Sequence, residues 1–214
     1  MLIAYEGIDG SGKTTSSQSL CSALRKRGET VTVVQWTSFM IRGGEENPLF
    51  RSAERNRERA RLGPLAYAVW HCADFAYRLE QHVFPALARG ETVIMDRYAY
   101  TGFVRDVIRG VDERVVRSLY TFAPEPQLVV YLDVDPALAY RRKKTSSAEI
   151  GYYERGHDLY PDLGEEEGFI AFQSRCRARY PDVLPPGTLR LDGSRPPEEL
   201  TAAILDAVSA KRGL

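Results

Sequence analysis

The sequence has few cysteines, and they show neither the pattern of a disulfide framework nor that of a metal site. The three cysteines of the 214-residue chain, Cys21, Cys72 and Cys176, are odd in number and far apart. No ligand pairs at zinc-site spacing occur, so a structural metal centre of that kind is not expected. We expect the three residues to be small buried side chains in a protein from a reducing compartment.

The sequence also lacks a long hydrophobic run and a recognisable signal peptide. No apolar stretch approaches the roughly 20 residues that cross a membrane as a helix. The first strand-like run starts at Leu2, so we expect no signal peptide ahead of the fold. We therefore expect a cytoplasmic protein without a membrane partner.

An excess of charge of either sign is absent as well. Lysine plus arginine and aspartate plus glutamate number 29 each, so the chain has no bulk attraction to nucleic acid or anionic lipid. Hydrophobic residues make up 43% of the chain, which is ordinary for a globular protein. A chain of this length suits a single domain over residues 1–214 and can bury a substantial core.

Residues 7–14 carry the most informative motif. They read Gly-Ile-Asp-Gly-Ser-Gly-Lys-Thr and match the phosphate-binding loop (P-loop, Walker A) pattern G-x-x-x-x-G-K-[ST]. An apolar-rich run precedes the motif and a helical pattern follows it, so backbone N–H groups and the positive end of the helix converge on one point. Lys13 would reach the outer phosphates of a nucleoside triphosphate, and the Thr14 hydroxyl would ligate Mg²⁺. The alternative is a chance glycine turn before a helix.

Strand-like and helix-like segments alternate along the chain. Strands are expected at 2–6, 30–35, 91–96, 127–133 and 188–192. Helices are expected at 15–27 with Gly28 as a C-cap, around 52–62, at 64–88, from Glu165 onward, and at 197–211. Pro85 is expected to kink or restart the last turn of the 64–88 helix. Near-continuous apolar strands with helices between them predict an α/β fold, in which a parallel sheet is covered on both faces.

A second motif, Asp96-Arg97-Tyr98, follows the strand expected at 91–96. An acidic residue at the carboxyl end of a buried strand lies on the edge where open α/β sheets place ligands. Asp96 would therefore belong to the magnesium shell, and Arg97 would direct a guanidinium into the same crevice to grip a phosphate. The alternative is an ordinary Asp-Arg pair in a solvated turn.

Together these motifs resemble the thymidylate kinase family of P-loop nucleoside monophosphate kinases. The similar segments occur in the family's order: 6–15, 85–90, 96–98, 132–136 with the arginines at 141 and 142, and 192–194 with 197–199. The resemblance implies a three-layer P-loop kinase fold with a five-stranded parallel sheet and a lid insertion at about 143–165. It implies transfer of the γ-phosphoryl group from ATP with Mg²⁺ to a phosphate acceptor, foremost thymidine monophosphate (dTMP) to give the diphosphate (dTDP). It also implies a homodimer that pairs through residues 64–88.

The resemblance assigns roles residue by residue. Catalytic roles fall on Asp9, Lys13, Arg97, Arg142 and Lys144. ATP contacts fall on Asp9, Gly10, Ser11, Gly12, Lys13, Thr14, Thr15, Arg142 and Ser194, and Mg²⁺ contacts fall on Thr14 and Asp96. Contacts with the acceptor nucleotide fall on Asp9, His71, Phe75, Arg97, Tyr98, Thr101 and Arg105. Asp9 would face the acceptor's sugar, Arg97 would hold its phosphate, and Arg142 would flank the adenine of ATP.

The basic run at 141–144 and the glycine-containing stretch after it suggest a closing segment. Phosphoryl transfer needs positive charge around the reacting oxygens, and the P-loop here has no arginine of its own. A lid that carries Arg142 and Lys144 would supply that charge and exclude water. The alternative is a basic helix end, which is favourable simply because cations suit helix C-termini.

The acceptor site is where the sequence departs from the family. The family's Arg-Glu-Pro element after the second strand is replaced by residues 35–38, Gln-Trp-Thr-Ser. His71 aligns with a stacking phenylalanine, Phe75 with a base-contacting arginine, and Arg105 and Asp106 with a Tyr-Gln pair. Trp70, His71, Phe75 and Tyr100 would either form a stacking wall for a base or belong to the core.

These departures leave three functions open. The first is a kinase of thymidylate type, and the second is a P-loop kinase of another monophosphate or phosphorylated metabolite. In either kinase, residues 152–158 are candidates for contact with the acceptor. The third is a nucleotide-dependent switch. Switches that bind GTP carry an Asn-Lys-x-Asp element, and neither asparagine of this chain, Asn47 or Asn56, lies in one.

Overall fold

The computed structural model describes residues 1–36, 62–146 and 150–213. Its centre is a sheet of five parallel strands in the order β2-β3-β1-β4-β5. The strands are β1 (Leu2–Glu6), β2 (Val31–Gln35), β3 (Thr92–Asp96), β4 (Leu128–Asp133) and β5 (Leu189–Asp192). Each lies within one residue of the bounds expected from the sequence. The predicted α/β fold with a five-stranded parallel sheet is confirmed.

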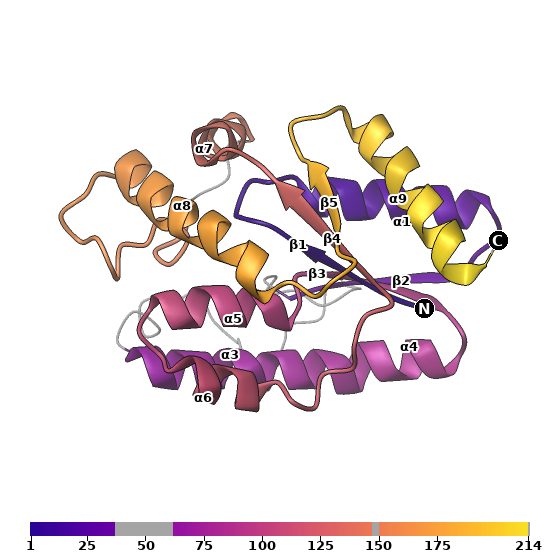
Figure 1. The fold of residues 1–214 in the computed structure, drawn as a ribbon, viewed down its shortest axis with the longest axis horizontal. Coiled ribbons are helices and arrows are strands. Elements are labelled where there is room, and N and C mark those ends of the chain that lie inside the picture. The colour runs from indigo at the N-terminus through magenta and orange to yellow at the C-terminus, as the bar shows by residue number, and fades with distance from the viewer. Residues whose placement is uncertain (37–61, 147–149, 214) are drawn as a thin grey trace.

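Helices cover both faces of this sheet (Figure 1). In chain order they are α1 (Lys13–Lys26), α3 (Pro64–Arg78), the π-helix η2 (Leu79–Val83), α4 (Phe84–Ala88), α5 (Ala99–Ile108), α6 (Glu113–Leu119), α7 (Pro136–Thr145), α8 (Glu165–Val183) and α9 (Pro197–Arg212). None of the helices in the described part of the chain is long and apolar enough to cross a membrane.

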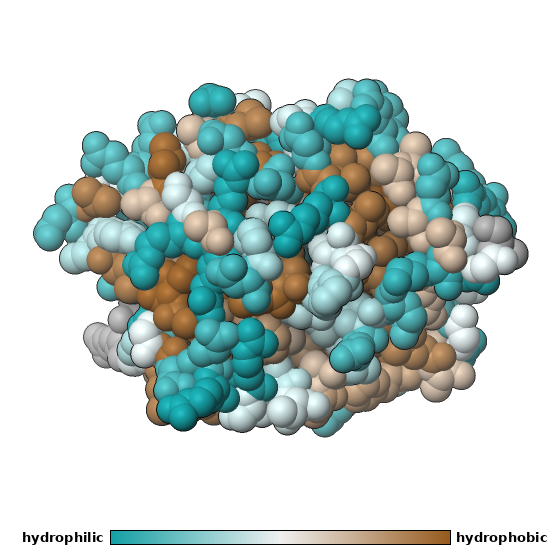
Figure 2. Space-filling view, in the orientation of Figure 1, coloured by the Kyte–Doolittle hydropathy of each residue, from teal (hydrophilic) through white to brown (hydrophobic). Residues whose placement is uncertain are grey.

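Alternating side chains of the central strand divide the core into two halves. Leu2 and Ala4 of β1 belong to a hydrophobic cluster with residues of α3, α5, α6 and α8. Ile3 and Tyr5 belong to a second cluster with residues of α1 and α9. This alternation is what a strand buried on both faces requires. In the view of Figure 2, hydrophobic side chains gather where α5 and α8 face each other.

The helix expected at 64–88 is present, but a π-helical turn interrupts it shortly before Pro85. Pro64 occupies its first turn, and the π-helical turn at 79–83 separates α3 from α4. A proline cannot donate to the preceding turn, so the altered winding ahead of Pro85 accommodates it. Gly28 has a φ of 85° and follows α1 as the expected C-cap glycine. The helix expected around 52–62 lies outside the described residues, except for Leu62.

Three helices, α5, α6 and α7, have no counterpart among the helices expected from the sequence, where only the basic end of α7 was considered as a helix end. They are short, and Gly102 interrupts the apolar pattern of α5. That glycine is required by packing, because a Cβ at this position would lie 2.8 Å from the Tyr120 ring. The three cysteines are buried and free, as expected.

Candidate active site

The loop between β1 and α1 has the backbone geometry that its glycines predict. Gly10 and Gly12 have φ angles of 77° and 92°, a region that L side chains rarely adopt. A Cβ on Gly10 would also lie 2.5 Å from the Ala139 carbonyl oxygen, so α7 packs directly on the loop. The loop leads into the N-terminus of α1 at Lys13, where backbone N–H groups remain to be satisfied. This turn can bind an anion.

Lys13 lies inside the loop and closes it. Its Nζ donates to the carbonyl oxygens of Gly7 at 3.0 Å and Ile8 at 2.7 Å, and to the Ser11 hydroxyl at 3.2 Å. The side chain is buried, and burial together with the nearby Arg97 guanidinium lowers the pKa of its amine to about 7. Phosphate oxygens would favour the charged amine, because they bring negative charge to a cation that burial destabilises.

The Thr14 hydroxyl and the Asp96 carboxylate meet at the carboxyl edge of the parallel sheet. Thr14 Oγ1 donates to Asp96 Oδ2 at 2.5 Å, although 82 residues separate the two in sequence. A hydroxyl and a carboxylate, both oxygen donors, suit Mg²⁺ held by one or two protein ligands with water and phosphate oxygens. No cluster of three or more His, Cys, Asp or Glu side chains that could hold a metal ion exists among the described residues.

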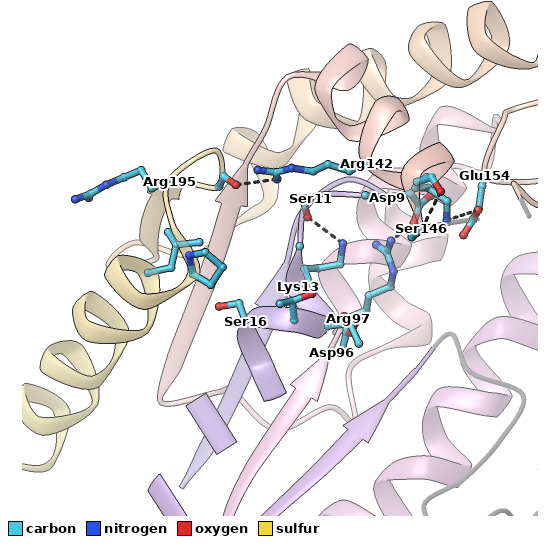
Figure 3. Close-up of a pocket in the computed structure, with 18 residues that line it drawn as sticks. Asp9, Ser11, Lys13, Ser16, Asp96, Arg97, Arg142, Ser146, Glu154 and Arg195 are labelled. Carbon is cyan, nitrogen blue, oxygen red and sulfur yellow. Dashed lines mark hydrogen bonds and ion pairs between the residues drawn. The ribbon is translucent and has the colours of Figure 1, made fainter. Parts of the chain in front are cut away.

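A cavity of about 560 Å³ opens over this loop (Figure 3). Its lining includes residues 9–16 of the loop and α1, Asp96 and Arg97 after β3, and Arg142 and Lys143 of α7, with Gly193 and Arg195 beyond β5. Arg142 spans one wall, because its Nη1 donates to the Gly193 carbonyl at 2.9 Å. Ser194 is fixed beside this wall, with its backbone N–H donating to Asp192 Oδ1 at 2.9 Å.

Arg97, which follows the neighbouring strand β3, also lines this cavity. Among the described residues it is the one non-glycine residue with a positive φ, 76°. This conformation costs roughly 1 kcal/mol or more for a residue with a Cβ, so the surrounding contacts must hold it. Its Nη1 donates to the Gly7 carbonyl at 3.2 Å and to the Thr101 hydroxyl at 3.3 Å, and its Nη2 pairs with Asp9.

Asp9 is a buried carboxylate shared by two guanidiniums. Arg97 contacts one oxygen, and Arg105 Nη1 lies 2.8 Å from the other. Burial alone would raise the pKa of Asp9, but Arg105, Arg97 and Lys13 together hold it well below its ordinary value. Asp9 is therefore a fixed anion between two groups that can also bind phosphate.

Glu6, at the end of β1, holds the turn that carries Arg97. This fully buried carboxylate accepts hydrogen bonds from the N–H groups of Tyr98 at 2.9 Å and Thr101 at 3.0 Å. It also accepts from the hydroxyls of Thr101 at 2.8 Å and Tyr180 at 3.0 Å. Burial raises its pKa, and Arg97 opposes that shift. Glu6 thus caps the start of α5, a role that sequence reasoning did not assign to it.

The basic run at the end of α7 divides between two environments. Lys143 lines the cavity and pairs with Glu154 at 2.8 Å. Lys144 does not line it, and its half-exposed amine binds Glu165 at 3.1 Å instead. Successive helical side chains differ by roughly 100° in direction, which explains why neighbours in the run face different partners. Among the lysines of this run, Lys143 and not Lys144 lies at the cavity.

Three ring-bearing residues expected on the acceptor side, His71, Phe75 and Tyr98, pack into the interior, whereas Trp70 and Tyr100 are only partly buried. Phe75 is fully buried, and its ring lies 4.8 Å from Trp36 and 5.1 Å from Tyr98. His71 stacks on Trp36 at 4.3 Å with an interplanar angle of 18°. Tyr98 is buried, and its hydroxyl donates to the Pro124 carbonyl. His71, Phe75, Tyr98, Thr101 and Arg105 do not line the cavity over the P-loop.

Gln173 and Asp106 are two further buried polar residues near the site, of which sequence reasoning aligned Asp106 with an acceptor-site position and did not single out Gln173. Gln173 Nε2 donates to Asp9 Oδ2 at 2.8 Å, and 164 residues separate them. Neither Asp106 carboxylate oxygen has a hydrogen-bond partner within the described ranges. Burial raises the pKa of Asp106 to about 7, against the opposing effect of Arg109 and Arg105. No sequence motif marks Gln173, because only the packing of α8 on the loop brings it to Asp9.

A parallel sheet whose first strand runs into this loop, with Lys13, Thr14 and Asp96 converging on one cavity, defines a P-loop phosphotransferase of the α/β class. Comparison with known proteins is more specific. The thymidylate kinase family profile matches residues 5–204, so the chain belongs to the thymidylate kinase family.

Individual relatives support the family assignment. The chain is 33% identical to a probable thymidylate kinase 2 from Saccharolobus solfataricus, over 92% of this chain and 89% of the relative. It is 33% identical to a thymidylate kinase from Deinococcus radiodurans, over 99% and 97% of the two chains. It is 32% identical to a thymidylate kinase from Akkermansia muciniphila, over 98% and 92%. The resemblance noted in the motifs therefore extends along nearly the whole chain.

Proposed function

We propose that this protein transfers the γ-phosphoryl group of ATP to dTMP, which yields dTDP and ADP. Membership of the thymidylate kinase family supports this reaction. The observation that carries it is the shared cavity, where Lys13 on the donor side and Arg97 on the acceptor side line the same space. Two phosphorylated substrates can meet there with cations on both sides of the transferred group.

On the donor side, the backbone of residues 10–15 would cradle the ATP phosphates. Lys13 would exchange its contacts with Gly7 and Ile8 for phosphate oxygens. The Thr14 hydroxyl and the Asp96 carboxylate would hold Mg²⁺, which when bound offsets the negative charge of the phosphates. Arg142 would lie against the adenine, and the backbone at Ser194 would flank it.

On the acceptor side, Arg97 would hold the phosphate of the nucleoside monophosphate. Its guanidinium is already oriented by Gly7, Thr101 and Asp9, so little ordering is needed on binding. Asp9 would accept a hydrogen bond from a sugar hydroxyl, and Arg105 beside it would add positive charge. This arrangement positions the attacking phosphate oxygen, and the reaction needs little proton abstraction.

The segment at about 143–165 would act as a lid. Lys143 and Glu154 line the cavity and pair with each other across its rim. Closure over bound substrates would exclude water, strengthen the electrostatic contacts and suppress hydrolysis of ATP. Lys144 would contribute to this segment through Glu165 and not through the phosphates.

A second candidate is a kinase for another monophosphate or phosphorylated metabolite. It is favoured by the changed acceptor side, where Phe75 stands fully buried at the position of a base-contacting arginine and Asp106 adds a buried carboxyl group. A nucleotide-dependent switch is not favoured, since no guanine-reading motif occurs in the sequence.

A coupled assay of ADP release across a panel of monophosphates and phosphorylated metabolites separates these functions. We expect turnover that depends on dTMP and exceeds that with any other acceptor by about tenfold or more. Stronger turnover with a different acceptor would establish the second candidate. ADP release independent of every acceptor would contradict both.

We also propose Mg²⁺ dependence, a cytoplasmic location and a homodimer that pairs through residues 64–88. Two large hydrophobic side chains of α3, Leu65 and Val69, are 55% and 48% exposed, which supports a partner on that helix. Light scattering after size-exclusion chromatography measures the mass, and a mass near 24.1 kDa would contradict the dimer.

A further inference from the structure

The 150–164 segment is attached to the rest of the molecule through its own backbone. The Tyr153 carbonyl accepts hydrogen bonds from Nη2 of Arg105 in α5 at 3.2 Å and from Nη2 of Arg109, the residue after α5, at 3.0 Å. The next carbonyl, that of Glu154, accepts from Gln173 Nε2 of α8 at 2.8 Å. Two adjacent peptide groups of the segment are therefore held by side chains from two different helices.

The same side chains also hold Asp9 of the P-loop. Arg105 Nη1 and Gln173 Nε2 each lie 2.8 Å from Asp9 Oδ2. The Asp9 backbone N–H in turn donates to Gln173 Oε1 at 3.1 Å. Gln173 is 1% exposed and Asp9 is 5% exposed, so bulk water has little access to replace these contacts.

Further contacts stiffen this connection on the α5 side. Arg109 forms an ion pair with Asp158 of the segment at 2.7 Å. The guanidiniums of Arg105 and Arg109 lie over the Phe172 ring, 5.1 Å and 4.4 Å from its centroid. A guanidinium over an aromatic face is held by cation–π attraction and by packing, which fixes where its N–H groups point.

We infer that Gln173 and Arg105 are positioning residues that couple closure of the 150–164 segment to the placement of Asp9. The inference deepens the proposed function and rests on it, since Asp9 is assigned there to the acceptor side. Each of the two side chains bridges Asp9 and a carbonyl of the segment. The segment cannot lift away without disturbing the groups that hold this buried carboxylate.

Through this coupling, binding of the acceptor should strengthen closure of the 150–164 segment. An acceptor phosphate on Arg97 weakens the ion pair between that guanidinium and Asp9 without displacing the guanidinium, because both anions compete for its N–H groups. The hydrogen bonds that Arg105 and Gln173 donate to Asp9 then become stronger. This fixes the two side chains in the positions from which they also bind the segment's carbonyl groups. Because linkage is reciprocal, the acceptor stabilises the closed segment and the closed segment favours the acceptor. ATP alone leaves the segment less firmly closed, so the structure favours transfer to the acceptor over transfer to water.

Hydrogen exchange of residues 150–164 in Gln173→Leu tests the connection directly. Leucine keeps the approximate size of glutamine and removes its bonds to Asp9 and Glu154. In the protein without nucleotide, we expect exchange in this segment to be faster by roughly tenfold. The matched control is Ser174→Ala, the exposed neighbour on α8, which should exchange like the parent. Unchanged exchange in Gln173→Leu would overturn the inference.

A kinetic readout separates positioning from a merely structural role. In Gln173→Leu, the ratio of ATP hydrolysis to phosphoryl transfer should rise by about tenfold while the KM for ATP changes less than about threefold. A variant that loses both reactions in equal proportion would be structurally damaged, and that result would contradict the inference.

Arg105→Lys provides a second variant should Gln173→Leu fold poorly. A lysine keeps one cation for Asp9 but lacks the fork that also reaches Tyr153, so we expect the same rise in the hydrolysis ratio. A ratio like that of the parent would overturn the role of Arg105. If the parent does not phosphorylate dTMP, the proposed function fails, and the exchange experiment still decides the connection because it uses no substrate.

Discussion

The two sides of the cavity differ in what builds them. The donor side consists mostly of backbone from one short stretch, the glycine loop and the first turn of α1. The proposed acceptor side borders the cavity through Arg97, and behind Arg97 lie side chains of β1, α5 and α8 that meet only in the folded chain. A backbone cradle follows from local sequence, whereas a side-chain pocket depends on packing. The donor side therefore matches the family motif, while the acceptor side is where this chain has changed.

The largest effect should come from breaking the donor side at Lys13. Lys13→Ala removes the cation closest to the P-loop carbonyls, and we expect kcat to fall by at least about a hundredfold. Steady-state kinetics with saturating ATP measure this. Lys26→Ala, an exposed lysine at the end of α1, is the control and should behave like the parent. Near-parental activity of Lys13→Ala would remove Lys13 from the active site.

Substitution of Arg97 tests the acceptor side. Two variants separate the loss of the guanidinium from the relief of backbone strain at this position. Arg97→Ala and Arg97→Gly both lose the guanidinium, so each should lower kcat/KM for the acceptor by roughly a hundredfold and affect ATP much less. Glycine accepts the φ of 76°, so Arg97→Gly should be about 1 kcal/mol more stable than Arg97→Ala. Urea unfolding measures the difference. Equal kinetic losses for ATP and acceptor would move Arg97 out of the acceptor site.

Asp106 sharpens the comparison through pH, because the acceptor side contains a buried acid whose pKa is raised to about 7. Between about pH 4 and pH 7 the folded protein keeps a proton that the unfolded chain releases, so folded stability falls as pH rises through this window. Asp106→Asn cannot titrate. Its stability relative to the parent should therefore grow by about 2 to 3 kcal/mol between pH 5 and pH 8.

Chemical denaturation of both proteins at the two pH values measures this change. Groups other than Asp106 titrate in both proteins and cancel in the difference. A difference between variant and parent that is independent of pH would mean that Asp106 is ionised in the folded protein throughout this range.

The smallest effect is expected at the α7 wall of the donor side. Arg142→Met should raise the KM for ATP by about fivefold, since one guanidinium contact with the base is worth roughly 1 kcal/mol. Lys144→Met should change it less than about twofold, because that amine binds Glu165 outside the cavity. Initial rates over a range of ATP concentrations distinguish them. A larger effect of Lys144 would place its amine on the nucleotide.

The sequence predicted the positions of the five strands and the convergence of Thr14 and Asp96 beside the phosphate-binding loop. Strand positions followed from β-branched apolar runs, and the convergence of Thr14 and Asp96 followed from parallel strands that share one edge. Helix α5 was missed because it is short and Gly102 breaks its pattern. Lys143 lines the cavity and Lys144 does not. This difference depends on how α7 is rotated about its axis, and amino-acid composition does not predict that rotation.

The acceptor side was harder to predict because its residues act through long-range packing. Gln173 reaches Asp9 only because α8 packs across the loop, and nothing near Gln173 in the sequence marks it. Glu6 directly precedes the phosphate-binding loop motif, but its role depends on N–H groups more than 90 residues away. His71 and Phe75 align with family positions, yet their environment is set by Trp36. Their part in binding an acceptor stays a prediction.

The most direct test of the shared cavity is binding of a single ligand that joins adenosine and thymidine through five phosphates. If Lys13 and Arg97 serve one reaction, this ligand should bind at least about a hundredfold more tightly than ATP or dTMP alone. Calorimetry should show that Lys13→Ala and Arg97→Ala each abolish that advantage. An affinity no better than that of the stronger half would contradict the proposal that donor and acceptor meet in this cavity.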